Sequence, residues 1–167
     1  MIIVSDSGPL AYLVAIGVAD SLPELYGDVY VPPAVLAELQ HPRCPVVVWA
    51  SHLPDWVHVV APQTTPIESQ LDLGEREAIA LALEFGAERI LMDEKRGRKA
   101  AQEVGLKVAG TLAVVLDGAL HGLFDGEAAI DRLAGTNFYA SPKLLETVRE
   151  LLRKTPPKSL TGREFRR

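Results

Sequence analysis

Acidic side chains follow two strongly apolar segments of this 167-residue chain. Asp6 directly follows residues 2–5 (IIVS), and Asp93 directly follows residues 89–92 (RILM). Two carboxylates ~4 Å apart repel each other by about 4 kcal/mol at an effective dielectric near 20. A bound cation removes that repulsion, and hard ions such as Mg²⁺ or Mn²⁺ suit all-oxygen sites. The chemistry favoured by such a cluster is activation of water and stabilisation of a phosphoryl transition state.

Two glutamates are candidates to join these aspartates. Glu38 lies in a segment of helical periodicity, beside the apolar Leu39. Glu75 lies near the start of the clearest helical segment, residues 73–85. Helical spacing places Glu75 on the same face as Ala78, whereas its neighbour Glu77 faces a more acidic side. We therefore expect Glu75 to be the acid that turns inward.

Each of these acids also has a simpler interpretation. Asp6 can begin a turn, Asp93 can cap the helix that follows it, and Glu38 can be a solvated helix residue. Asp72 and Glu75 have the spacing of a capping box. A functional interpretation therefore depends on all four candidate acids lying at one place in the fold.

Strands and helices alternate along the chain. Apolar segments predict strands at residues 2–5, 28–31, 56–60, 89–92 and 106–110. Helical patterns predict helices at residues 9–18, 34–40, 73–85, 94–104, 111–123, 126–135 and 141–154. This alternation favours a parallel sheet covered on both faces, and right-handed crossovers leave few topologies. We expect a three-layer α/β/α sandwich with about five parallel strands in the order 3-2-1-4-5.

That strand order predicts where the aspartates meet. Strands 1 and 4 are neighbours in it, and their connections leave to opposite faces of the sheet. Ligands bind in the crevice that such a switch point creates at the carboxyl ends of the strands. Because Asp6 ends strand 1 and Asp93 ends strand 4, we expect both carboxylates at this crevice.

Composition and length exclude several classes of protein. Hydrophobic residues make up 48% of the chain and charged residues 23%, which indicates a globular domain. The single cysteine, Cys44, cannot form an internal disulfide, which fits a reducing compartment. The N-terminus lacks the basic region of a signal peptide, and no apolar run approaches the ~20 residues that cross a bilayer. We expect a cytoplasmic protein with no membrane partner.

The charge is unevenly distributed along the chain. The net charge is -5, although the last fifteen residues hold six Lys or Arg and one Glu. That segment carries +5, so the other 152 residues carry -10. We predict one domain over residues 1–152 and a basic tail over residues 153–167. The tail can contact nucleic acid or an acidic partner, or it can be a solvated terminus.

Four motifs together resemble the PIN-domain family, especially its short prokaryotic stand-alone members. They read DSGPL at 6–10, GEREAI at 74–79, DEKRGRKA at 93–100 and VAGTLAVVL at 108–116. The resemblance spans roughly residues 1–152. It implies an α/β/α sandwich with an acidic pocket, in which Mg²⁺ or Mn²⁺ supports hydrolysis of RNA phosphodiester bonds.

The family's four acids fall on the positions selected from the fold: Asp6, Glu38, Glu75 and Asp93. The third acid is often Asp in the family. Many members also carry Thr or Ser two residues before the fourth acid, where this chain has Leu91. The resemblance implies RNA, expected as single strands, as the substrate. Since many members are toxins, it also implies an antitoxin protein as a partner.

By analogy with two-metal hydrolases, we expect Asp6 and Asp93 to bind the metal directly. Glu38 and Glu75 complete the shell, directly or through water, and one of them helps to deprotonate the attacking water. We expect Ser7 to hydrogen-bond a carboxylate or a metal-bound water. We also count Ser7 among the nucleic-acid-binding residues, together with four cations that could hold the phosphate backbone: Lys95, Arg96, Arg98 and Lys99. Their simpler interpretation is an exposed helix face that offsets nearby acids.

The same residues allow two alternatives to a nuclease to be compared with it. A catalytically silent module that binds nucleic acid or a protein partner would keep the acidic pocket as scaffolding. A phosphatase with Asp6 as nucleophile is disfavoured, because Gly8 stands where a second Asp is needed. The apolar helices predicted after residue 110 are suited to a homodimer interface.

Overall fold

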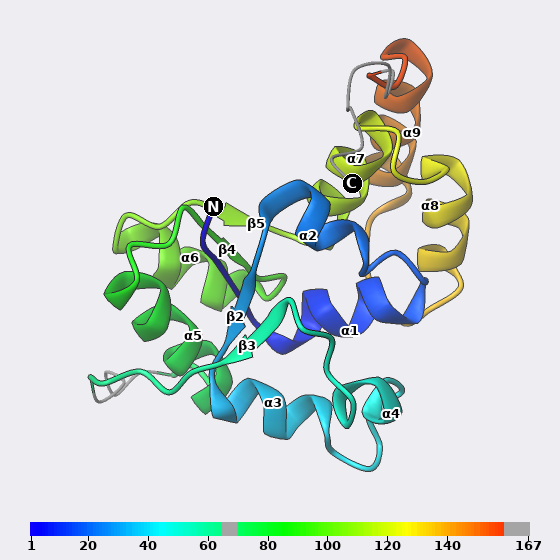
Figure 1. The fold of residues 1–167 in the computed structure, drawn as a ribbon. Helices are drawn as coiled ribbons and strands as arrows, with labels where there is room; N and C mark the ends of the chain where they lie inside the picture. Colours follow the sequence, from blue (N-terminus) through cyan, green and yellow to red (C-terminus); the bar gives the residue numbers. More distant parts are fainter. Residues whose placement is uncertain (65–69, 159–167) are drawn as a thin grey trace, which may run out of the picture. The chain divides into compact units, whose positions relative to one another are not determined.

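A five-stranded parallel sheet organises residues 1–111 in the computed structural model, which describes residues 1–64 and 70–158 (Figure 1). The strands are β1 (Ile3–Ser5), β2 (Val29–Val31), β3 (Val57–Val59), β4 (Arg89–Leu91) and β5 (Val108–Ala109). They lie in the order β3-β2-β1-β4-β5, and helices surround them. The predicted α/β/α architecture and strand order are confirmed.

Five helices of at least seven residues accompany the sheet or lead out of it. They are α1 (Ser7–Ala15), α3 (Pro33–Leu39), α5 (Leu73–Glu84), α6 (Lys95–Glu103) and α7 (Thr111–Leu120). The short helices α2 (Ser21–Tyr26) and α4 (Val47–Ala50) were not predicted. Six and four residues are too few to show a helical period, and prolines surround α4 in the sequence.

The central strands are short and largely buried, and β1 is buried at every residue. Val4 of β1 aligns with Tyr30 of β2 on one side and with Ile90 of β4 on the other. The β1–β4 ladder continues past the strand, since the Asp6 N–H donates to the Leu91 carbonyl at 2.9 Å. Strand pairing therefore determines the backbone position of Asp6 at the carboxyl edge of the sheet.

The residues after Thr111 form a second compact unit. It contains most of α7 together with α8 (Gly126–Ala134) and α9 (Pro142–Lys154). Arg149 of α9 pairs with Asp131 of α8 at 2.7 Å and also with Glu127. The predicted domain boundary after residue 152 remains a prediction, and residues 159–167 of the basic tail lie outside the described residues.

In the two described ranges, none of the helices combines the length and apolarity required to cross a lipid bilayer.

Candidate functional site

Asp6 has an unusual environment for a carboxylate. Asp6 is only 6% exposed, and its Oδ1 is buried with no hydrogen-bond partner among the described residues. Asp6 occupies the N-cap position of α1, yet its side chain makes no capping bond. A buried charged oxygen without a partner is costly. The atom is therefore suited to bind a cation or a proton.

Glu38 approaches the same region from α3. The hydroxyl of Ser7, the first residue of α1, donates a hydrogen bond to Glu38 Oε2. The other oxygen, Oε1, lies so close to Gly74 that a Cβ there would overlap it. The Glu38 carboxylate therefore lies between the start of α1 and the start of α5, as the predicted contact of Ser7 with a carboxylate requires.

Glu75 combines a helix-capping role with burial at the site. The Glu75 N–H donates to Asp72 Oδ1 at 2.8 Å, and the Asp72 N–H donates to Glu75 Oε2 at 3.2 Å. This capping box agrees with the local sequence pattern. Glu75 is also only 6% exposed, and its Oε1 would lie 2.8 Å from a Cβ placed on Gly97 of α6.

Glu77 points elsewhere, as expected. Its Oε2 accepts a hydrogen bond of 3.0 Å from the Ala34 N–H, near the start of α3. Glu75 is thus the inward acid of the pair. Glu77 instead satisfies one of the free backbone donors in the first turn of α3, the helix that carries Glu38.

Asp93 is held by a residue that the sequence did not suggest. Thr111 donates to Asp93 twice, from its N–H to Oδ1 and from its hydroxyl to Oδ2, each at 2.7 Å. The simpler interpretation of Asp93 as the N-cap of α6 is wrong, because Glu94 occupies that position. Asp93 Oδ2 also lies 3.6 Å from a Cβ placed on Gly8, which brings it to the β1–α1 turn.

The electrostatics of the site are dominated by negative charge. Burial raises the pKa of Asp6 to about 7; the Ser7 N–H opposes this rise, and Glu38, Asp72 and Glu75 add to it. Burial also raises the pKa of Glu75, with Asp72 as the next contributor. The pKa of Glu38 is raised by burial of its carboxylate, although much of the residue is exposed. A cation at this position would relieve all three shifts.

The arrangement limits how a metal ion could be held. Within residues 1–64 and 70–158, no three His, Cys, Asp or Glu side chains gather closely enough to hold one ion. Mg²⁺, however, usually keeps several waters and binds through one or two carboxylates. The unpartnered Asp6 oxygen and the all-carboxylate donor set fit such a hydrated ion. They do not form a closed cage.

The predicted phosphate-binding residues have different environments. Lys95 and Arg96 are exposed in the first turn of α6. Lys99 is also exposed and forms a loose ion pair with Glu103 at 3.8 Å. Arg98 donates to the Met92 carbonyl at 3.0 Å, so it supports the connection between β4 and α6. Three of the four cations therefore extend into solvent.

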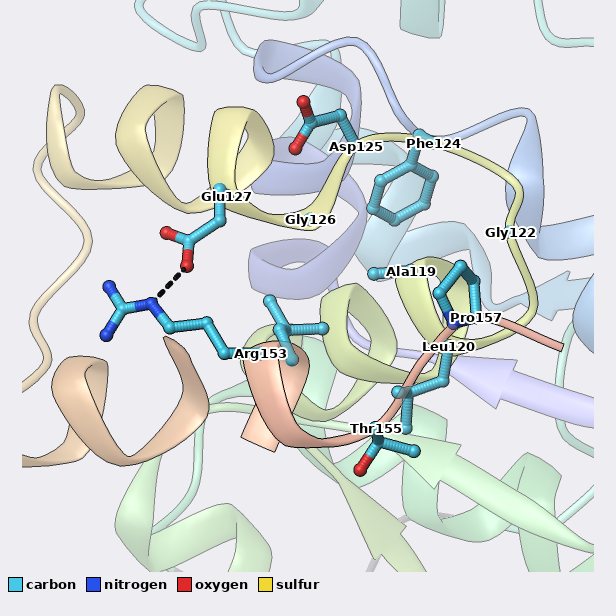
Figure 2. Close-up of a pocket in the computed structure, with 11 residues that line it drawn as sticks. Ala119, Leu120, Gly122, Phe124, Asp125, Gly126, Glu127, Arg153, Thr155 and Pro157 are labelled. Carbon is cyan, nitrogen blue, oxygen red and sulfur yellow. Dashed lines mark ion pairs between the residues drawn. The ribbon is translucent and has the colours of Figure 1, made fainter. Parts of the chain in front are cut away.

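A separate concavity lies in the second unit, with a volume of about 460 Å³ (Figure 2). Figure 2 shows Glu127 and Arg153 facing each other there, and their side chains are 3.3 Å apart. None of the four candidate acids lines this pocket. The lining residues are Ala119, Leu120, Gly122, Phe124, Asp125, Gly126, Glu127, Leu152, Arg153, Thr155 and Pro157.

The fold and the site together define a class of protein: a parallel α/β/α domain with acids from four segments near the carboxyl edge of its sheet. A family model described as a PIN domain matches residues 2–154. The chain belongs to the PIN-domain family, as its motifs predicted. PIN domains are generally nucleases and typically use divalent metal ions. No curated protein and no solved structure matched the chain.

Proposed function

We propose that this protein is an endoribonuclease that uses Mg²⁺ or Mn²⁺ to hydrolyse phosphodiester bonds in single-stranded RNA. The observation that carries the proposal is the buried, unpartnered Oδ1 of Asp6. Burial is the main cause of the raised pKa of this carboxylate, and the negative charges of Glu38, Asp72 and Glu75 add to it. A hard cation stabilises the ionised form of such a carboxylate, and PIN-domain nucleases typically use such cations.

Each acid has a defined part in this proposal. Asp6 and Asp93 would bind the ion directly, while Glu38 and Glu75 would contribute directly or through water. When bound, the ion lowers the pKa of a water nucleophile and neutralises charge on the phosphate. Ser7 orients Glu38 through Oε2, which leaves Oε1 as the atom that accepts a proton from the attacking water. This assignment gives Glu38 the role of general base.

The RNA backbone would approach along the start of α6. Lys95 and Arg96 are exposed there, only two and three residues beyond Asp93, and Lys99 lies one turn further along. Such cations confer affinity for phosphates without reading sequence. The proposal extends to a toxin role with an antitoxin partner, as in related prokaryotic proteins, and to a homodimer. Copurification with the product of a neighbouring gene would test the antitoxin.

Metal removal tests the proposed activity. EDTA is expected to stop cleavage of a mixed-sequence single-stranded RNA, and Mn²⁺ or Mg²⁺ is expected to restore it. Glu75→Gln should lower the restored rate by about 10- to 100-fold. A glutamine still accepts the Asp72 N–H and keeps the capping box, so the helix should remain intact. The rate is measured with end-labelled RNA.

Glu88→Gln is the matched control, because Glu88 is an exposed acid outside the site. It should cleave at the wild-type rate. A rate that survives EDTA, or an equal rate in all three proteins, would indicate a contaminating nuclease and contradict the proposal. RNA binding without cleavage in any metal would favour the silent binding module, which the absence of a three-acid cage among the described residues also favours.

The glycines beside the glutamates provide a second test. Gly74→Ala is expected to displace the Glu38 carboxylate, and Gly97→Ala places a Cβ 2.5 Å from Met92 Sδ and 2.8 Å from Glu75 Oε1. Both should weaken Mn²⁺ binding by about tenfold or more in calorimetry. Alanine favours a helix by about 1 kcal/mol over glycine, so weaker binding cannot result from helix propensity. Gly135→Ala in the second unit is the control, and unchanged affinity in both site variants would contradict the assigned roles.

A further inference from the structure

We infer that Thr111 is a positioning residue that fixes the Asp93 carboxylate for metal binding, an inference that rests on the proposed function. Thr111 is completely buried, and the structure gives its hydroxyl one hydrogen bond, to Asp93. Neither the sequence pattern nor the family match assigns this residue a role. The inference therefore adds a fifth side chain to the four acids.

The two contacts fix the orientation of the carboxylate. The Thr111 N–H donates to Oδ1 and its hydroxyl donates to Oδ2, both at 2.7 Å. A single hydrogen bond would allow the group to rotate about that contact, whereas two bonds to different oxygens prevent rotation. Bonds of this length to an ionised acceptor are also stronger than neutral ones. We call this pair of bonds the Thr111 clamp.

The register between β4 and β5 places Thr111 beside Asp93. The Met92 N–H donates to the Ala109 carbonyl at 2.9 Å, so the residues after each strand lie side by side. Gly110 permits the close approach, since a Cβ there would lie 2.9 Å from Asp93 Oδ1 and 2.7 Å from Arg98 Nη1. Gly110 thus leaves room for the Asp93 carboxylate, and Thr111, the next residue, donates two hydrogen bonds to it.

The clamp leaves acceptor capacity on Asp93 for a ligand. An ionised carboxylate offers about four lone-pair sites, and Thr111 uses two of them. Asp93 Oδ2 also lies 3.6 Å from a Cβ placed on Gly8, two residues after Asp6. The clamped carboxylate therefore lies beside the turn that carries the other direct ligand. Partners of this kind, which orient a ligating side chain, typically contribute 10- to 100-fold in metal affinity or activity.

The test compares Thr111→Val with Thr111→Ser in the full-length protein. Valine has a similar shape but no hydroxyl, so it should weaken Mn²⁺ binding by about 10- to 100-fold in calorimetry and lower kcat with little change in KM. Serine keeps the donor and should remain within about threefold of wild type. Thr147→Val is the control, because it removes an exposed hydroxyl bond of 2.8 Å to Lys143 in α9.

A second readout separates this inference from the proposed function. The ¹³Cγ resonance of Asp93 in the metal-free protein should be single and sharp in wild type and Thr111→Ser, and shifted or broadened in Thr111→Val. An unchanged resonance and unchanged affinity in folded Thr111→Val would overturn the positioning role. If wild type binds no Mn²⁺, the proposed function fails, and the Asp93 resonance alone then supports or overturns the clamp.

Discussion

Asp6→Asn is expected to lower RNA cleavage by at least about 100-fold and to remove measurable Mn²⁺ binding. Loss of a residue that only orients a metal ligand lowers metal affinity or activity by about 10- to 100-fold. Loss of a direct ligand should therefore lower them by at least the upper end of that range. Asp6 is the least replaceable acid, because β1 pairing fixes its backbone and its Oδ1 has no other partner among the described residues. Calorimetry with Mn²⁺ and the RNA assay measure both effects.

The fold should survive this substitution. Asparagine has nearly the same shape, and its side-chain oxygen can still accept the Ser7 N–H bond that the Asp6 carboxylate accepts. It is a cleaner variant than Asp93→Asn, in which an amide group would face one of the two Thr111 donors. Circular dichroism verifies folding, and Glu88→Gln controls for the loss of one negative charge. Cleavage at the wild-type rate by folded Asp6→Asn would disprove the site assignment.

The unfolding free energy of the metal-free protein is expected to fall as the pH rises from about 4 to about 7. The pKa of Asp6 is about 7 in the folded protein against 3.8 for the free side chain. The folded state therefore binds more protons than the unfolded state in this interval, and stability declines with rising pH. Each pKa unit corresponds to 1.36 kcal/mol, so Asp6 can contribute up to about 4 kcal/mol. The raised pKa values of Glu38 and Glu75 act in the same direction.

Urea unfolding in EDTA at pH 5 and pH 8 measures this effect. In Asp6→Asn, most of the decline in unfolding free energy with rising pH should be absent. The variant should therefore be more stable than wild type at pH 8. Adding Mg²⁺ at pH 8 to 100 times its Kd should stabilise wild type by about 2.7 kcal/mol, but not the variant. Equal pH dependence in the two proteins would show that Asp6 is not the buried acid responsible.

The secondary structure followed from local patterns wherever an element was long enough to show them. The capping box of Asp72 and Glu75 spans three residues and was recognisable in the sequence. The orientation of Glu75 followed from helical spacing, because the period of an α-helix determines which side chains share a face. Helices α2 and α4 were missed since six and four residues show too little of a helical period.

The sequence by itself determined the strand order and the two aspartates at the strand ends, because alternating strands and helices with right-handed crossovers leave few arrangements. Only the tertiary structure decided what holds these acids. Ser7 and Glu38 are 31 positions apart, Glu77 and Ala34 are 43 apart, and Asp93 and Thr111 are 18 apart. Such contacts depend on strand register and helix packing, which no local period encodes. Thr111 is also fully buried, so in the sequence it resembles an ordinary first residue of a helix.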